Sequence, residues 1–114
     1  MEIEREIVLP SPPNEVWPAL TEPERLEEWF ANEVELDARP GGHGVFRWAN
    51  GEERHAVVET VDPDRRLELR WDDAGTVELT LEEVAEGTRL VVRETAPDWA
   101  AALELNALAL CPTG

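Results

Sequence analysis

The sequence predicts one α+β domain built on a curved antiparallel sheet. Three observations lead to this fold class: apolar and polar residues alternate in an N-terminal segment, they alternate again through most of residues 33–95, and apolar residues recur at helical spacing between and after these segments. The chain has 114 residues, so a second domain would be too small to sustain its own core. We therefore treat residues 1–114 as a single domain.

The N-terminal part predicts a strand followed by two short helices. Residues 2–9 place Ile3, Ile7 and Leu9 in one phase of a strand, which Pro10 ends. Ser11 and the prolines after it favour a helix start, and a second start is indicated by Thr21 with Glu24 three residues later, the spacing of a capping box. Apolar residues line one face of each predicted helix, namely Val16, Trp17 and Leu20 in the first and Leu26, Trp29 and Phe30 in the second.

The middle of the chain predicts a meander of five or six antiparallel strands. Turn residues separate the alternating segments, among them Asn50-Gly51 and Asp62-Pro63. The expected strands cover residues 33–38, 44–49, 53–61, 66–71, 76–84 and 88–95.

The C-terminal part predicts a helix that is apolar on nearly all sides. Pro97-Asp98 opens it, and it continues to Leu110 with Glu104 and Asn106 among its few polar residues. One sheet covers only one side of such a helix, so the other side needs the short helices or a second subunit. We expect that a homodimer could form through this helix.

Composition excludes several classes of function. The chain has 26 Asp and Glu residues against 10 Arg and Lys, a formal charge of −16, and this field repels nucleic acid and anionic membrane surfaces. A basic protein partner would be attracted instead. No apolar run reaches the roughly 20 residues of a membrane span, and the N-terminus lacks the pattern of a signal peptide, so we expect a cytoplasmic location.

The inventory of reactive side chains argues against common catalytic mechanisms. The sequence contains no Lys and no Tyr, and its one Ser, Ser11, lies among prolines. The single Cys111 can form no internal disulfide and fits no zinc spacing, and the two His residues match no metal-ligand spacing. We expect no cofactor and no metal, and the inventory favours a protein that is not an enzyme.

Five Trp residues in so short a chain are the main candidates for binding. Filling of the core is one interpretation, and the other is that Trp48, Trp71 and Trp99 line a cavity for a flat apolar ligand. His55 could orient a ligand if its side chain points inward, or it could be solvated on the outer face. Arg47 and Arg70 favour cross-strand ion pairs, whereas an inward Arg would mark a site for an acidic apolar molecule.

Short sequence motifs resemble one known family along nearly the whole chain. The order of elements is that of a helix-grip domain, and the motifs follow the family's order: PNEVW at 13–17, LEEW at 26–29, DARPGG at 37–42, VDPDRRL at 61–67 and EGTRL at 86–90. They are similar to the activator-of-heat-shock-protein-90-ATPase homologue branch of the START-like, or SRPBCC, superfamily. The loop before the last helix is shorter here than is usual in that branch.

The resemblance implies a fold, a cavity and three possible functions. A curved sheet would grip the C-terminal helix over a hydrophobic cavity, and the fold alone does not select an activity. We expect a binding domain for a small hydrophobic, aromatic or lipid ligand. A co-chaperone-like domain that binds a protein and a polyketide cyclase or dehydratase are the alternatives. The expected ligand-binding residues are Trp48, His55, Trp71, Leu79, Leu90, Trp99 and Leu103.

Overall fold

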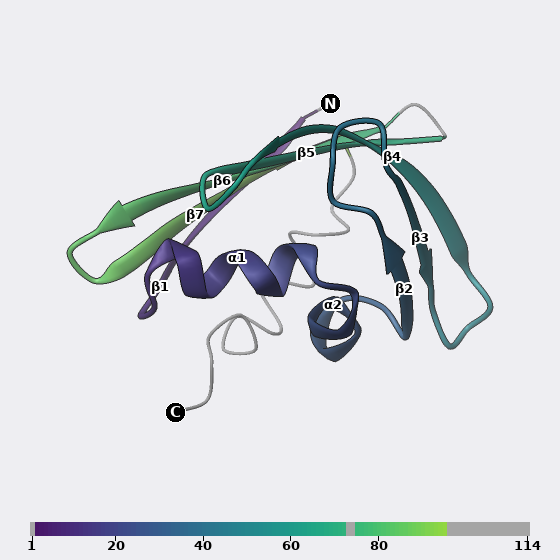
Figure 1. Cartoon of the computed structure of the whole chain (residues 1–114), viewed down its shortest axis with the longest axis horizontal. Coiled ribbons are helices and arrows are strands. Elements are labelled where there is room, and N and C mark those ends of the chain that lie inside the picture. Colours follow the sequence, from purple (N-terminus) through teal and green to yellow (C-terminus); the bar gives the residue numbers. More distant parts are fainter. Residues whose placement is uncertain (1, 73–74, 96–114) are drawn as a thin grey trace.

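The computed structural model describes residues 2–72 and 75–95, and it confirms the predicted order of elements over this part of the chain (Figure 1). The strands are β1 (Ile3–Leu9), β2 (Glu33–Leu36), β3 (His43–Arg47), β4 (Glu53–Asp62), β5 (Arg66–Trp71), β6 (Thr76–Val84) and β7 (Gly87–Glu94), and the helices are α1 (Pro13–Thr21) and α2 (Pro23–Trp29). The predicted C-terminal helix lies outside the described residues.

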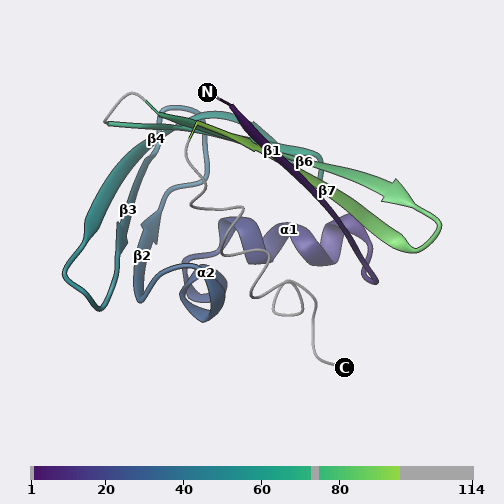
Figure 2. The same ribbon diagram turned by 180° about the vertical axis from the view of Figure 1, so that it is seen from behind.

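All seven strands form one antiparallel sheet with the order β1-β7-β6-β5-β4-β3-β2. Strands β2 to β7 follow one another as a meander, whereas β1 pairs with β7 in a register that runs from Ile3 opposite Glu94 to Leu9 opposite Thr88. The sheet is curved, and both helices lie on its concave side (Figures 1 and 2). We call this side the inward face and the opposite side the outward face.

The two helices cover separate parts of the inward face. Helix α1 has its main sheet contacts with β6 and β7, and α2 has its main sheet contacts with β2. The carboxylate of Glu27 accepts a hydrogen bond of 2.9 Å from the backbone N–H of Val34, so α2 also caps part of the edge strand β2. These two helices therefore give the central strands β4 and β5 less cover than the two ends of the sheet.

Both helix starts that the sequence predicted differ in detail from the structure. The residue before α1 is Pro12 and the residue before α2 is Glu22, and neither helix has a side-chain cap. The hydroxyl of Thr21 instead donates 3.0 Å to the carbonyl of Trp17, one turn back in α1, so the predicted capping box is wrong. The carbonyl of Ser11 accepts a buried 2.6 Å hydrogen bond from the Thr88 hydroxyl, which ties the chain before α1 to β7.

The turn at Asn50-Gly51 is a hairpin with a three-residue loop. The backbone N–H of Trp48 donates to the backbone carbonyl of Glu52 at 2.9 Å, and the N–H of Gly51 donates to the carbonyl of Trp48 at 3.0 Å. Gly51 has a positive φ of 89°. Strand β3 therefore ends at Arg47, and Trp48 belongs to the turn rather than to the middle of a strand.

The outward face carries cross-strand ion pairs, as the sequence predicted for Arg47 and Arg70. Arg47 contacts carboxylates on two neighbouring strands, and Arg70 lies 2.7 Å from Glu59. Further pairs join Arg66 to Glu78, Arg89 to Glu6 and Arg93 to Glu4. Within residues 2–72 and 75–95, no helix is long and apolar enough to cross a membrane.

Candidate functional site

The inward face of the sheet is built from alternate residues of the strands. Apolar side chains from all seven strands are buried on it, because residues directly opposite one another in antiparallel strands point to the same face. They include Phe46, Ala56, Val58, Leu67, Leu69, Trp71, Val77, Leu79, Leu90 and Val92. This is the face on which the sequence analysis expects a ligand to bind.

Aromatic rings form a continuous row along one end of this face. Phe30, at the end of α2, contacts Phe46 with ring centroids 5.4 Å apart and Trp48 with centroids 5.5 Å apart. Phe46 in turn contacts Trp71 edge-to-face, at 5.5 Å and 69°. We call Phe30, Phe46, Trp48 and Trp71 the aromatic row. Edge-to-face contacts of this kind stabilise a fixed arrangement of the rings.

Arg54 lies at the end of the aromatic row. Its guanidinium carbon is 4.1 Å from the centroid of the Trp71 ring, a cation–π contact. Arg54 stands opposite Phe46 and two residues before Ala56, both of which are buried on the inward face. This Arg is therefore an inward cation, the arrangement that the sequence analysis considered for Arg47 and Arg70.

Glu94 is a second charged residue on the inward face. It stands opposite Val77 in β6 and Ile3 in β1, and it is only 1% exposed. Arg5 stands opposite Val92, two residues after Ile3 on β1, so its side chain leaves the strand on the same face. A carboxylate buried to this degree is unusual in a protein.

His55 lies on the outward face, away from the apolar wall. Its side chain is 47% exposed, and its Nε2 atom lies 2.9 Å from Glu53 Oε2. The hydrogen bond from His55 and a second from Arg47 lower the pKa of Glu53 below its ordinary value. The same contact with Glu53, together with a hydrogen bond to Glu35, raises the pKa of Arg47. This network belongs to the solvent face of the sheet.

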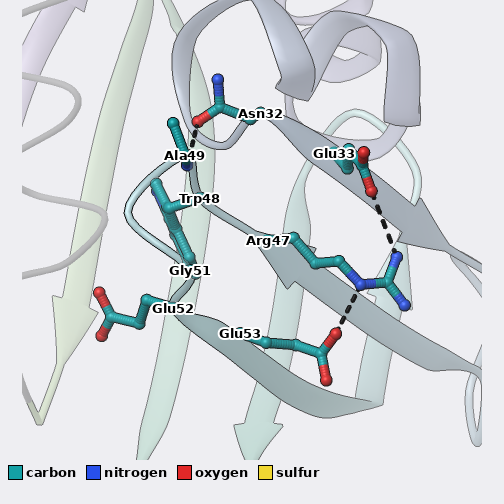
Figure 3. Close-up of a pocket in the computed structure, with 8 residues that line it drawn as sticks. All are labelled: Asn32, Glu33, Arg47, Trp48, Ala49, Gly51, Glu52 and Glu53. Carbon is teal, nitrogen blue, oxygen red and sulfur yellow. Dashed lines mark hydrogen bonds and ion pairs between the residues drawn. The ribbon is translucent and has the colours of Figure 1, made fainter.

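A shallow recess lies beside the β3–β4 turn (Figure 3). Its volume is about 240 Å³, and the residues around it are Asn32, Glu33, Arg47, Trp48, Ala49, Gly51, Glu52 and Glu53. Figure 3 shows Arg47 reaching toward both Glu33 and Glu53, and Asn32 accepting a hydrogen bond from the Ala49 N–H at 2.8 Å. These contacts bind the turn to β2 and to the segment before it.

The structure brings some of the expected site residues onto one face and separates others. Leu79 and Leu90 are diagonal neighbours on β6 and β7, and Trp71 lies on the same inward face nearer the β5–β6 turn. Trp48 lies in the β3–β4 turn and contacts the Phe30 ring of the aromatic row. His55 is on the other side of the sheet. Trp99 and Leu103 lie outside the described residues.

Sequence reasoning missed Arg54 and Glu94 as inward residues. Arg54 alternates in phase with Ala56 and Val58, and Glu94 alternates in phase with Leu90 and Val92. In both strands this alternation indicates that the charged side chain lies on the same face as the buried apolar residues. A charged residue in the apolar phase of a strand was the pattern to look for.

Together the curved sheet, the two helices after its first strand and the apolar inward face define a START-like domain of the helix-grip class. The family model described as "Activator of Hsp90 ATPase homolog 1-like protein" matches residues 10–107, which is most of the chain. The chain belongs to this family, as the sequence motifs indicated. No protein of curated function matches the sequence.

Solved structures with the same fold come from several bacteria. CalU16 from Micromonospora echinospora is 27% identical with a TM-score of 0.75, over 97% of this chain and 75% of that one. Protein BH1534 from Bacillus halodurans is 28% identical with a TM-score of 0.73, over 84% of this chain and 69% of that one. The AHSA1-like protein from Aeromonas hydrophila is 17% identical with a TM-score of 0.78, over 100% of this chain and 98% of that one, and shows the fold alone.

Proposed function

We propose that this domain binds a small, flat, apolar molecule on the inward face of the sheet, beside Trp71. The aromatic row is the observation that carries the proposal: it leads from α2 across β3 to Trp71 on β5, and it ends at a cation. Apolar and aromatic walls with a few polar groups are typical of small-molecule sites. The wall around Trp71 is contributed by Ala56, Val58, Leu69 and Val77, with Leu79 and Leu90 farther along the same face.

Burial of the wall sets a condition on binding. Trp71 is 3% exposed and Leu69 is fully buried, so a ligand has to displace existing packing contacts in order to reach them. A flat ring system suits this condition better than a bulky one, because the packed side chains have to separate only by the thickness of the ring. Binding should therefore change the environment of Trp71 directly.

A titration of the intrinsic Trp fluorescence tests the proposal. Flavonoids, aromatic polyketides and fatty acids would be added to the wild type and to Trp71→Phe, which keeps a ring at this position. We expect a saturable change in the wild type that is mostly lost in Trp71→Phe and kept in the matched control Trp17→Phe. A folded wild type that gives no saturable change with any of these compounds would refute the proposal.

The outward face favours a second candidate function, that of a co-chaperone-like domain. Its ion-pair network is surrounded by an excess of carboxylates, since the chain carries 26 acidic residues and 10 basic ones. Such a surface attracts a basic protein surface in a salt-sensitive manner. The test is the ATPase rate of an Hsp90-type chaperone with and without the domain, at low and high salt. A salt-sensitive increase would favour this function, and no effect at either salt concentration would exclude it.

An enzyme of the polyketide cyclase or dehydratase type would need a proton-transfer group on the inward face. His55 faces outward, so Glu94 is the carboxylate that could serve. Turnover of a bound aromatic polyketide that is lost in Glu94→Gln with binding retained would favour the enzyme. Binding without turnover would favour the simple binding domain.

A further inference from the structure

We infer that Asn50 is a site of deamidation, at which the chain modifies itself when the hairpin between β3 and β4 opens. The inference does not depend on the ligand proposed above. Asn50 is exposed in the three-residue loop, and it is the only one of the four Asn residues that precedes a Gly. A Cβ at Gly51 would meet nothing within 4 Å, so the backbone nitrogen of this residue is unobstructed on the side where a side chain would lie.

The reaction needs only water as a partner. The Gly51 nitrogen loses its proton and attacks the side-chain carbonyl carbon of Asn50, which closes a succinimide ring, and the side-chain amide leaves as ammonia. Water then opens the ring at either of its carbonyls. The products have Asp at position 50, or isoaspartate, in which the main chain runs through the former side-chain carbonyl. Each product adds one negative charge to the chain, and Asn is thermally labile in proteins.

Hydrogen bonds of the closed hairpin keep the two reacting groups apart. The N–H of Gly51 donates to the Trp48 carbonyl at 3.0 Å, and the side-chain oxygen of Asn50 accepts from the N–H of Glu52 at 2.9 Å. Gly51 has to release Trp48 before its nitrogen can bond to the Asn50 side chain. The rate of deamidation should therefore follow the fraction of molecules in which this hairpin is open.

Two contacts from outside the loop keep the hairpin closed. The Asn32 side chain accepts from the Ala49 N–H at 2.8 Å (Figure 3), and the Trp48 indole donates to the Phe30 carbonyl at 2.8 Å. Isoaspartate would act against both contacts, because it adds an atom to the main chain of the loop and so shifts Trp48 relative to Glu52. The product should therefore loosen the end of the aromatic row that is nearest to α2.

Incubation of the whole chain in mildly alkaline buffer, followed by peptide mapping, tests the inference. Trypsin cleaves after Arg47 and Arg54 and releases residues 48–54 as one peptide, in which chromatography with mass spectrometry separates Asn, Asp and isoaspartate. We expect isoaspartate in the folded wild type and at least about tenfold faster formation in guanidinium chloride, which corresponds to an opening free energy of roughly 1.4 kcal/mol. Asn14, which precedes a Glu, is the internal control and should remain Asn over the same time.

Two variants separate the hairpin from the chemistry. Asn32→Ala removes the acceptor of the Ala49 N–H, so this variant should deamidate about fivefold faster than the wild type when both are folded, the factor for a hydrogen bond of about 1 kcal/mol. In guanidinium chloride the two proteins should react at the same rate. Gly51→Ala, unfolded in the same way, should react more slowly, because a Cβ then obstructs the approach to Asn50.

The wild type alone can overturn the inference. A folded wild type that keeps Asn50 while the unfolded chain reacts would show that the native protein is not modified. Equal rates in the folded and unfolded chain would show that the hairpin exerts no control, and equal rates at Asn50 and Asn14 would show that Gly51 has no effect.

The modified protein tests the effect on the turn. Anion exchange separates it from the wild type by its additional charge, and its unfolding midpoint should be lower than that of Asn50→Asp. This variant has the same charge with an unaltered main chain. Equal midpoints for the isoaspartate form and Asn50→Asp would overturn the effect on the turn.

Discussion

The indole N–H of Trp48 donates a hydrogen bond of 2.8 Å to the backbone carbonyl of Phe30. This bond joins the turn between β3 and β4 to the residue at the end of α2, and the two rings also meet edge-to-face with centroids 5.5 Å apart. These contacts hold Trp48 at the beginning of the aromatic row. Trp71, at the other end, is the residue that we expect to meet a ligand.

Trp48→Phe should lower stability and leave ligand binding in place. The substitution keeps an aromatic ring but removes the donor to the Phe30 carbonyl, at a cost of about 1 kcal/mol for a half-buried bond. Urea denaturation followed by circular dichroism would measure the change, and the fluorescence titration would measure binding. A large loss of affinity with unchanged stability would show that Trp48 itself contacts the ligand.

Trp29→Phe should be more destabilising than Trp48→Phe. The Trp29 indole N–H donates a buried hydrogen bond of 2.8 Å to the carbonyl of Ala19 in α1, which fixes α2 against α1. Loss of this donor leaves a buried carbonyl without its partner, at a cost of about 1–3 kcal/mol, and the smaller ring adds a cavity. Equal unfolding midpoints for the two variants would contradict this order.

Gly87→Ala should be strongly destabilising, whereas Gly51→Ala should be tolerated better. Both glycines have positive φ, 139° and 89°. A Cβ at Gly87 would overlap the backbone carbonyl of Leu9, but a Cβ at Gly51 meets nothing within 4 Å. We expect a loss of about 3 kcal/mol or more for Gly87→Ala, from a backbone clash, and about 1–2 kcal/mol for Gly51→Ala, from strain alone. Thermal unfolding would measure both, and similar losses would contradict the structure.

Glu53 should contribute stability that is lost in acid. Hydrogen bonds from His55 and Arg47 lower the pKa of Glu53 in the folded protein below its ordinary value of 4.5. The contribution is therefore complete above that value, and it declines as the pH falls below it through the lowered folded pKa. Urea unfolding of the wild type at neutral pH and in acid should show this decline, and Glu53→Gln should lack it. Glu52→Gln is the control for the loss of one negative charge, and an identical acid response of Glu53→Gln and the wild type would contradict the prediction.

Local patterns in the sequence predicted the fold well. The strand order of the meander follows from alternation and turn residues that act over a few positions, as at Asn50-Gly51 and Asp62-Pro63. The helix starts were predicted less well, because the bonding partners of Ser11 and Thr21 are not the expected cap groups. Thr88, which donates to the carbonyl of Ser11, is 77 residues away in the chain.

The faces of individual strand residues were harder to predict. Strand β4 has ten residues and a register shift between Val58 and Thr60, so its alternation does not continue with one phase. His55 could be assigned to either face from the sequence, whereas the structure exposes it beside Glu53. The sequence also could not show that β3 ends before Trp48, since the three-residue loop depends on the pairing of Trp48 with Glu52.

Two-dimensional proton–nitrogen NMR of the Trp indoles tests the central claim most directly. The five indole N–H signals can be assigned with single Trp→Phe variants and followed while the compound that binds tightest in the fluorescence titration is added. Binding beside Trp71 predicts a saturable shift of the Trp71 signal, whereas the Trp29 signal, held by Ala19, stays in place. A saturating ligand that shifts the Trp29 or Trp48 signals and leaves Trp71 unchanged would contradict the account.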